Sequence, residues 1–246
     1  MHRMKGESMR KLVAGAVIAF ALVVAAPVLA THSWNGYHWA RTSNPFTLKL
    51  GDNVSAAWDS YLATTSSDWS KSTVLDTTIV PGQARSKCRP TSGKVEVCSG
   101  SYGNNGWLGL AQVWVSGSHI TQGSVKVNDT YFAQAQYNTP SERNHVMCQE
   151  VGHTLGLDHQ STSGATLNTC MDYSSSTTSQ HPNQHDYDEL VTIYTHLDSS
   201  STVGAAANGS AADDPGLPAG AGPGRSVYVR DLGGGRKLYT FVVWAA

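Results

Sequence analysis

The amino-acid sequence predicts a mixed α/β or α+β layer structure, in which helices pack on a β-sheet. Three observations indicate this class. Residues 53–69 carry apolar side chains at helical spacing, several segments between residues 73 and 132 have strand character, and a second helix with a clear start follows at Pro140. A helix, a run of strands and a second helix in this order are typical of a layered domain.

The N-terminal 30 residues have the three regions of a secretory signal peptide. Two basic residues precede an apolar run over residues 12–24, and a small-residue exit ends at Ala30. The alternative is a retained membrane anchor, because the stretch from Leu12 to Ala30 could nearly span a bilayer. Pro27 and the small-residue ending favour cleavage. We therefore expect a secreted, extracellular protein without stable membrane association.

Charge and cysteine content limit the partners of the chain. The full sequence has 17 basic and 18 acidic residues, whereas residues 31–246 have 13 and 17, a net charge of −4. Because nucleic-acid-binding proteins present a basic surface, no nucleic-acid partner is expected. The roughly 216 remaining residues suffice for one well-buried domain plus an appendage, and we expect a monomer. Four cysteines in an exported chain predict disulfide bonds, for which three pairings exist.

Composition divides the exported part of the chain into three regions. The main domain, residues 31–198, contains four segments with strand character at residues 73–80, 94–98, 107–116 and 123–132. Residues 199–225 are almost wholly Ser, Gly, Ala, Pro and Asp, which predicts a flexible linker that cannot bury enough apolar surface to order itself. Residues 226–246 contain two strand-like runs around a glycine-rich turn and predict a β-hairpin. Because a lone hairpin is marginally stable in water, we expect it to dock on the main domain.

The second helix has well-marked ends. Thr139 suits the N-cap, Pro140 suits the first helical position, and Glu142 supplies the acid of a capping box. Gly156 provides a residue that can adopt the left-handed conformation at the other end. These signals predict a helix from residue 140 to about residue 155.

The end of that helix and the turn after it carry a metal-ligating pattern. Gln149 and His153 are four residues apart on one helical face, Glu150 lies about 100° round, and His159 follows the glycine turn. Residues 149–159 resemble the metzincin zinc-peptidase motif H-E-x-x-H-x-x-G-x-x-H at every fixed position except the first, where glutamine replaces histidine. In that motif two ligands one turn apart hold the metal from the helix, and the third reaches it from beyond the turn.

A second segment supports the same resemblance. Cys170-Met171-Asp172-Tyr173 resembles the Met-turn that lies beneath the metal in metzincins, although a methionine alone is more often part of a core. Tyr173 matches the Met-x-Tyr of astacin-like and serralysin-like members, where a phenol touches the metal or stabilises the oxyanion. Residues 182–197 carry apolar side chains at helical spacing, as in the final helix of matrixin-like domains.

The resemblance implies a fold, a cofactor and an activity. The implied fold is a metzincin-like domain with a twisted mixed β-sheet, an active-site helix, a Met-turn and a C-terminal helix. The implied cofactor is Zn²⁺, held by His153 and His159, with Gln149 at the remaining ligand position. The implied activity is that of a secreted zinc-dependent endopeptidase, which hydrolyses a protein or peptide substrate through a metal-activated water. Glu150 would then be the general base and Tyr173 a second catalytic residue.

Glutamine at position 149 leaves a second function open. Its neutral amide oxygen is a poor zinc donor, so Gln149 either coordinates weakly or holds a water beside the metal. His145 is an alternative ligand on the same face, but a helical rise of ~12 Å separates it from His153. His181 and His185 flank the start of the last helix, where capping and surface hydrogen bonds are expected. The histidines without motif context are His32, His38 and His119. The alternative function is a catalytically impaired, secreted binding or structural protein with a weak or empty metal site.

The positions of the cysteines favour one of the three pairings. Cys148 directly precedes the first ligand position and Cys170 directly precedes the methionine of the Met-turn, so a disulfide between them would tie these two segments together. Cys88 and Cys98 would then close a local loop. The alternative is Cys148 as a thiolate ligand of the metal, although its side chain points about 100° away from that of position 149.

Overall fold

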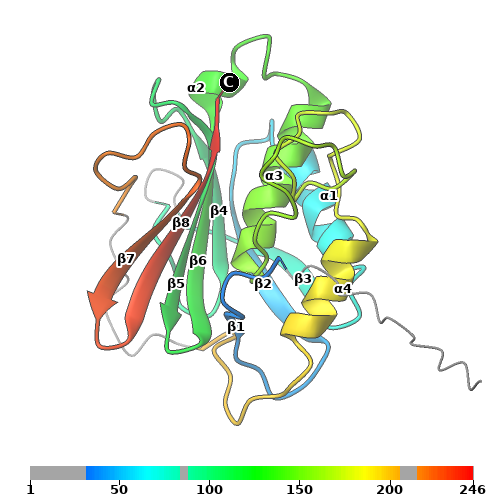
Figure 1. Cartoon of the computed structure of the whole chain (residues 1–246), viewed down its shortest axis with the longest axis vertical. Helices are drawn as coiled ribbons and strands as arrows, with labels where there is room; N and C mark the ends of the chain where they lie inside the picture. The colour runs from blue at the N-terminus through cyan, green and yellow to red at the C-terminus, as the bar shows by residue number, and fades with distance from the viewer. Residues whose placement is uncertain (1–31, 84–87, 206–214, 246) are drawn as a thin grey trace, which may run out of the picture. The chain divides into compact units, whose positions relative to one another are not determined.

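The computed structural model describes residues 32–83, 88–205 and 215–245, and its centre is an eight-stranded sheet (Figure 1). The strands are β1 (His38–Trp39), β2 (Phe46–Asn53), β3 (Leu75–Pro81), β4 (Val95–Gly100), β5 (Trp107–Ser116), β6 (His119–Asn128), β7 (Val227–Gly233) and β8 (Arg236–Trp244). The helices are α1 (Asp59–Trp69), α2 (Asp129–Phe132), α3 (Pro140–Thr154) and α4 (Gln184–Ile193). The predicted signal peptide lies outside the described residues.

The sheet is mixed, with the order β3-β2-β4-β6-β5-β8-β7, and the short strand β1 pairs with β6. Strands β2, β3, β4 and β6 are parallel, whereas β5, β8 and β7 pair antiparallel. Helices α1, α3 and α4 lie on one side of the sheet (Figure 1). The prediction of a mixed α/β layer structure is therefore confirmed. Within the described ranges, every helix is too short or too polar to cross a lipid bilayer.

Helix α3 begins and ends where the sequence predicts. The Thr139 hydroxyl accepts a hydrogen bond from the backbone nitrogen of Glu142 at 3.2 Å, and Pro140 is the first helical residue. The helix ends at Thr154, and Gly156 then adopts φ +104°. A Cβ atom at Gly156 would lie 2.6 Å from the carbonyl oxygen of Tyr37, so both conformation and space require glycine.

The first helix starts later than its apolar pattern predicts. Residues 53–58 are not helical, and the turn-like pair Gly51-Asp52 belongs, with Asn53, to β2. This position of the strand needs glycine, because a Cβ on Gly51 would lie only 2.2 Å from a carboxyl oxygen of the buried Glu96. The Asp52 side chain accepts from the backbone nitrogen of Val54 at 3.1 Å, which stabilises a turn before the helix.

Two other predicted boundaries are also wrong. The strand predicted over residues 123–132 ends at Asn128, because the Asn128 side chain accepts from the backbone nitrogen of Thr130 and caps the short helix α2. The final helix, predicted over residues 182–197, is limited to α4. Asn183 caps its start through a reciprocal pair of hydrogen bonds with Asp186.

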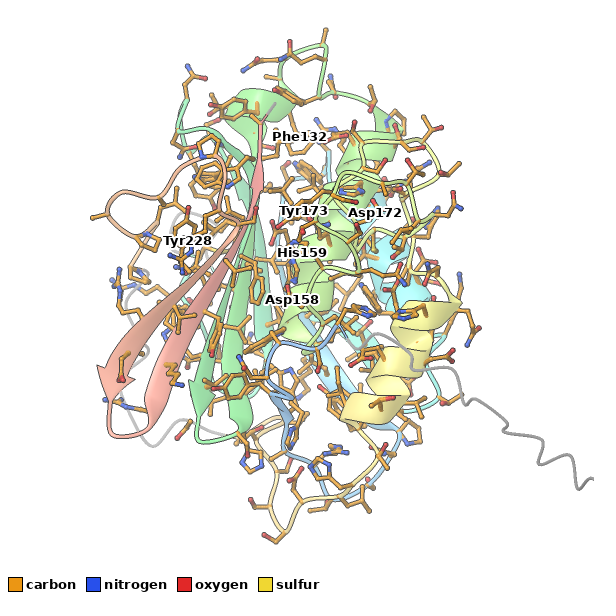
Figure 2. The ribbon with its side chains drawn as sticks, viewed as in Figure 1. Phe132, Asp158, His159, Asp172, Tyr173 and Tyr228 are labelled. Carbon is orange, nitrogen blue, oxygen red and sulfur yellow. A yellow bond between two sulfur atoms is a disulfide. The ribbon has the colours of Figure 1, made fainter. Side chains whose placement is uncertain are left out.

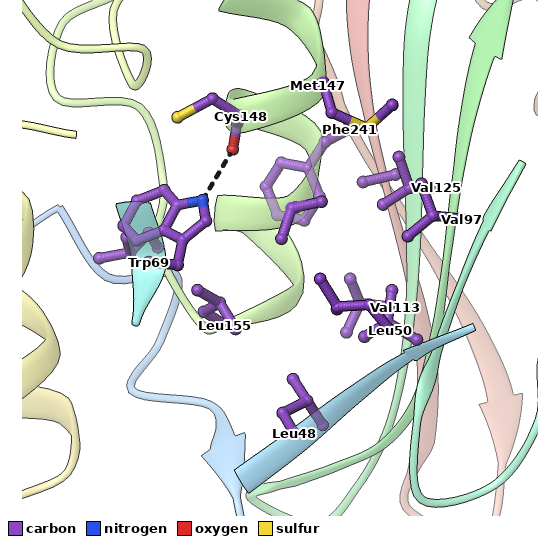
Figure 3. Close-up of a cluster of buried hydrophobic side chains, with 14 of the residues drawn as sticks. Leu48, Leu50, Trp69, Val97, Val113, Val125, Met147, Cys148, Leu155 and Phe241 are labelled. Carbon is purple, nitrogen blue, oxygen red and sulfur yellow. Dashed lines mark hydrogen bonds between the residues drawn. The ribbon is translucent and has the colours of Figure 1, made fainter. Parts of the chain in front are cut away.

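Helix α3 packs closely against both the sheet and α1, which fixes the position of the candidate site. A buried cluster of side chains from α3, the sheet and β8 fills this contact (Figure 3). Trp69 is fully buried, and its indole nitrogen donates to the carbonyl oxygen of Cys148 at 3.2 Å. A Cβ atom at Gly152 would lie 2.5 Å from the sulfur of Met171, so the methionine packs directly beneath α3. Truncation of such a buried tryptophan to alanine typically costs ~3–5 kcal/mol.

The C-terminal hairpin docks on the main domain, as expected. Strand β8 pairs antiparallel with β5, and its register places Val243 opposite Gly109 and Phe241 opposite Ala111. The described ends of the segment 199–225 also contact the domain. The backbone nitrogen of Thr202 donates to the carbonyl oxygen of Ala40, and the Gln112 side chain donates to the carbonyl oxygen of Gly216.

All four cysteines form the favoured pairs. Cys88 is bonded to Cys98, and Cys148 is bonded to Cys170, with Cα–Cα separations of 6.0 and 5.9 Å. The second bond ties α3 to the segment that resembles the Met-turn. Cys148 is therefore not a free thiolate, and its alternative role as a metal ligand is wrong. Two disulfides fit an oxidising, extracellular type of environment.

Candidate functional site

Two histidines meet where α3 ends. His153 lies in the last turn of the helix, and His159 follows the turn at Gly156. The ring centroids of His153 and His159 are 4.5 Å apart, with an angle of 69° between the rings. The two histidines predicted as metal ligands are therefore neighbours.

Both rings present an unpaired Nε2 atom. His153 Nδ1 lies 2.8 Å from the carbonyl oxygen of Leu157, which can only accept, so Nδ1 carries the proton and Nε2 the lone pair. His159 Nδ1 lies 3.2 Å from a carboxyl oxygen of Asp158 and 3.3 Å from the Tyr173 hydroxyl. Both Nε2 atoms are buried without a hydrogen-bond partner among the described residues. Burial lowers the pKa of both rings, most strongly at His153, which favours the neutral form that binds metals.

Gln149 points its amide nitrogen at the segment that resembles the Met-turn. Its Nε2 lies 2.7 Å from the carbonyl oxygens of both Cys170 and Asp172. Because carbonyl oxygens only accept, the opposite orientation of the amide would bring oxygen against oxygen. Oε1 of Gln149 is therefore the atom left free, and it is buried without a partner among the described residues. Gln149 fastens α3 to the turn and leaves one buried oxygen unpaired.

The side chain of Glu150 lies against the sheet at a glycine. A Cβ atom at Gly109 in β5 would lie 2.8 Å from Oε1 of Glu150, so a side chain there would block the carboxyl group. Oε1 accepts from the backbone nitrogen of Val243 in β8 at 3.3 Å, and Oε2 has no partner among the described residues. Burial raises the pKa of Glu150 well above its usual range, although hydrogen bonds from Val243 and Ala111 oppose this.

Tyr173 lies beside His159, on the side of α3 that faces β8 (Figure 2). The ring centroids of the two residues are 4.3 Å apart. Tyr173 and Gln149 line a cavity of about 350 Å³, together with His145 and Trp244. Burial raises the pKa of the Tyr173 phenol, so it keeps its proton and can donate a hydrogen bond.

Strand β8 covers the histidines and the glutamate. Phe241 stacks on His153, with centroids 4.1 Å apart and an interplanar angle of 11°. Phe241 and Val243 are two residues apart and so face the same side of the strand. Their contacts leave His153 and Glu150 fully buried. Sequence reasoning missed Phe241, because the alternation in the hairpin indicates a buried face but not what that face covers.

The other histidines near α3 have separate roles. His145 Nδ1 lies 2.6 Å from the carbonyl oxygen of Ser179, and its ring lines the cavity next to Gln149. His181 forms the expected surface hydrogen bond, to Asp68 at 2.6 Å. The capping role predicted for His181 and His185 is wrong, because Asn183 is the N-cap of α4. Within the part of the chain that the structure describes, two other groups of side chains could hold a metal ion: His32, His185 and Asp186, and His38, His119 and Asp198.

No protein-family model matches the chain, and no curated protein matches it. Any functional assignment therefore depends on the residues of the site themselves. Three of the buried atoms without partners among the described residues are candidate metal ligands: Nε2 of His153, Nε2 of His159 and Oε1 of Gln149. Imidazole nitrogen is a normal zinc donor and an amide oxygen a weak one, so by donor chemistry these residues could hold a metal ion through two strong ligands and one weak ligand.

Proposed function

We propose that the protein is a metallohydrolase of the metzincin type, and within that class a secreted zinc-dependent endopeptidase. The supporting observation is that the unpaired Nε2 atoms of His153 and His159 and the unpaired Oε2 of Glu150 are buried beneath the same strand. Unpaired polar atoms in a protein interior are costly, and they are tolerated where a ligand or ion uses them. His153, His159 and the amide oxygen of Gln149 would hold the zinc ion.

Each remaining group of the site has a role in peptide hydrolysis. Zinc, when bound, would polarise the peptide carbonyl and acidify a water molecule. Glu150 would accept the proton of that water and deliver it to the leaving amine. The Tyr173 hydroxyl would donate a hydrogen bond to the developing oxyanion. Asp158 would orient His159 by accepting from its Nδ1, as carboxylates do for metal-ligating histidines.

The proposed substrate is a protein or peptide in an extended conformation. Strand β8 occupies the edge of β5 next to Glu150, and an extended peptide could pair with that edge only in its place. Access to His153 would likewise require the Phe241 ring to leave. The proposed enzyme is therefore closed in the described conformation, and displacement of the hairpin precedes catalysis.

The test uses a chain that a specific protease can cut before the hairpin. A recognition sequence for a specific protease is inserted between Ala219 and Gly220, which are exposed and precede the hairpin. After cleavage and release of the hairpin, we expect zinc-dependent hydrolysis of unstructured peptides, and the same chain with Glu150→Gln should lose at least ~100-fold of that rate. Equal rates with and without Glu150→Gln would contradict its role as general base.

The second candidate function is a secreted binding or structural protein with an impaired site. Two observations favour it: the Gln149 nitrogen is committed to the turn, and the raised pKa of Glu150 favours its neutral form over the base. If the cleaved chain binds zinc but hydrolyses no peptide, this function replaces the endopeptidase. Zinc content by elemental analysis, measured beside the rate, separates an empty site from an inactive one.

A further inference from the structure

Three histidines and one aspartate gather where β1, the start of β6 and the segment after α4 meet (Figure 1). We propose that His38, His119, His196 and Asp198 form a second zinc site, with a structural role. None of these residues belongs to the candidate active site, and the proposal does not depend on peptidase activity.

The donor atoms have the spacing that a shared metal ion imposes. Two atoms bonded to one zinc ion at ~2.0–2.1 Å in tetrahedral geometry lie ~3.3 Å apart. Oδ1 of Asp198 lies 3.1 Å from Nε2 of His119, 3.5 Å from Nε2 of His38 and 3.7 Å from Nε2 of His196. Nε2 of His38 and Nε2 of His196 are 3.1 Å apart. These four of the six separations scatter around the value expected for ligands of one ion, and one donor atom each of His38, His119 and Asp198 lie within 4.8 Å of one another.

Neighbouring groups orient two of these ligands. His38 Nδ1 lies 2.9 Å from the carbonyl oxygen of Gly36, so it carries the proton of the neutral ring and Nε2 carries the lone pair. The other carboxyl oxygen of Asp198, Oδ2, accepts from the backbone nitrogen of Arg41 at 3.2 Å and from its guanidinium group at 2.9 Å. Oδ1 is therefore directed at the three imidazoles. Such outer hydrogen bonds are typical of histidine and carboxylate ligands.

The backbone brings the ligands together before any metal binds. His38 and His119 are register partners in the parallel pair of β1 and β6, so their side chains are neighbours on the sheet. The backbone nitrogen of Asp198 donates to the carbonyl oxygen of Arg41 at 2.9 Å. This bond fixes the segment after α4 against the residues that directly follow β1. Ordered backbone in all three segments reduces the entropy lost when an ion binds.

A neutral His38 ring presents a lone pair to the carboxyl group of Asp198. With the proton of His38 committed to Gly36, the Nε2 lone pair of His38 faces the carboxyl oxygen Oδ1 of Asp198 at 3.5 Å. A cation between these two atoms turns the repulsion into attraction. Three imidazole nitrogens and one carboxylate oxygen form a donor set that suits Zn²⁺. Four protein ligands leave no open position, which is typical of structural zinc and not of catalytic zinc.

The experiment compares zinc content in three forms of the full secreted chain. The wild type, the double variant His119→Asn/His196→Asn and the control His181→Asn are purified without chelator, and zinc per chain is measured by elemental analysis. His181 is a matched control, because its side chain is half exposed like that of His196 and it hydrogen-bonds an aspartate outside the cluster. We expect the double variant to contain one zinc ion fewer than the wild type and the control to contain the same amount.

A second measurement covers the case in which the double variant folds poorly. The wild type and the single variant His196→Asn are stripped with chelator and titrated with Zn²⁺ alone, while the melting temperature is recorded. The proposal predicts that zinc raises the melting temperature of the wild type and that His196→Asn weakens the affinity for this transition at least ~10-fold. Equal zinc content in all three forms, or the same zinc response in His196→Asn and wild type, would overturn it and leave the cluster as a hydrogen-bond network.

Discussion

Oε1 of Glu150 lies 3.3 Å from the backbone nitrogen of Val243, so the last strand of the chain donates a hydrogen bond to the proposed general base. Two residues earlier, Phe241 stacks on the proposed ligand His153. An extended segment that hydrogen-bonds the base and covers a ligand occupies the position that a peptide substrate would need. The C-terminal hairpin thus occupies the substrate position of the active site that we propose.

Weakening the contact of Phe241 should loosen the hairpin selectively. Phe241→Ala removes a fully buried ring, which typically costs ~3–5 kcal/mol. We expect faster hydrogen exchange in β8, with α3 still protected, and a higher peptidase rate without linker cleavage. Val229→Ala in β7 is the control, because that side chain is about half exposed at 49%. If α3 and β8 lose protection together, the hairpin is an integral part of the fold and not a displaceable cover.

The disulfide beside the site should contribute strongly to stability. Cys148 and Cys170 are 22 residues apart, and closing a loop of this length stabilises the folded chain by ~3 kcal/mol in the chain-entropy description. Cys148→Ser should therefore lower the denaturant midpoint and expose one free thiol. Thiol labelling and peptide mapping should find that thiol at Cys170. A label at Cys88 or Cys98 would show that the pairs rearrange.

Local signals predict α3 and the turn after it because each depends on residues adjacent in the chain. Thr139, Pro140 and Gly156 mark the ends of the helix, and the spacing of His153 and His159 brings their rings together. The disulfide between Cys148 and Cys170 follows from the same local motifs.

Other features depend on residues far apart in the sequence. Gly51 resembles a turn residue until the buried carboxyl group of Glu96, on the neighbouring strand β4, explains the need for glycine. Phe241 reaches His153 only through the pairing of β8 with β5. The cluster around Asp198 joins three separate segments, so His38 and His119 have no motif context in the sequence.

Acid should destabilise the folded protein through its buried histidines, and His145 offers a direct test. Burial lowers the pKa of His145 below the usual value for histidine, so the folded state keeps the ring neutral while the unfolded chain takes up a proton near pH 6.5. The contribution of the neutral His145 ring to the free energy of unfolding is therefore present above pH 6.5, and it is lost as the pH falls toward the lowered folded-state pKa. The free energy of unfolding, measured with urea between pH 5 and 8, should depend less steeply on pH in His145→Asn than in the wild type. The difference in slope should reach up to ~1.4 kcal/mol per pH unit. An unchanged slope, with His181→Asn measured in parallel, would exclude His145 as a contributor.

Replacing Gln149 by histidine should exchange stability for zinc affinity. The wild-type amide donates to two carbonyl oxygens at 2.7 Å, and losing a donor to a buried acceptor costs ~1–3 kcal/mol, so metal-free Gln149→His should unfold at lower denaturant. Imidazole is a far better zinc donor than an amide oxygen, so competition against a chromophoric chelator should show at least ~10-fold tighter zinc binding. Gln149→Met, which has similar length but no nitrogen ligand, should share the lost stability without the gain in affinity. If Gln149→His and Gln149→Met bind zinc equally, position 149 serves only to fasten α3 to the turn, and the metal depends on His153 and His159 alone.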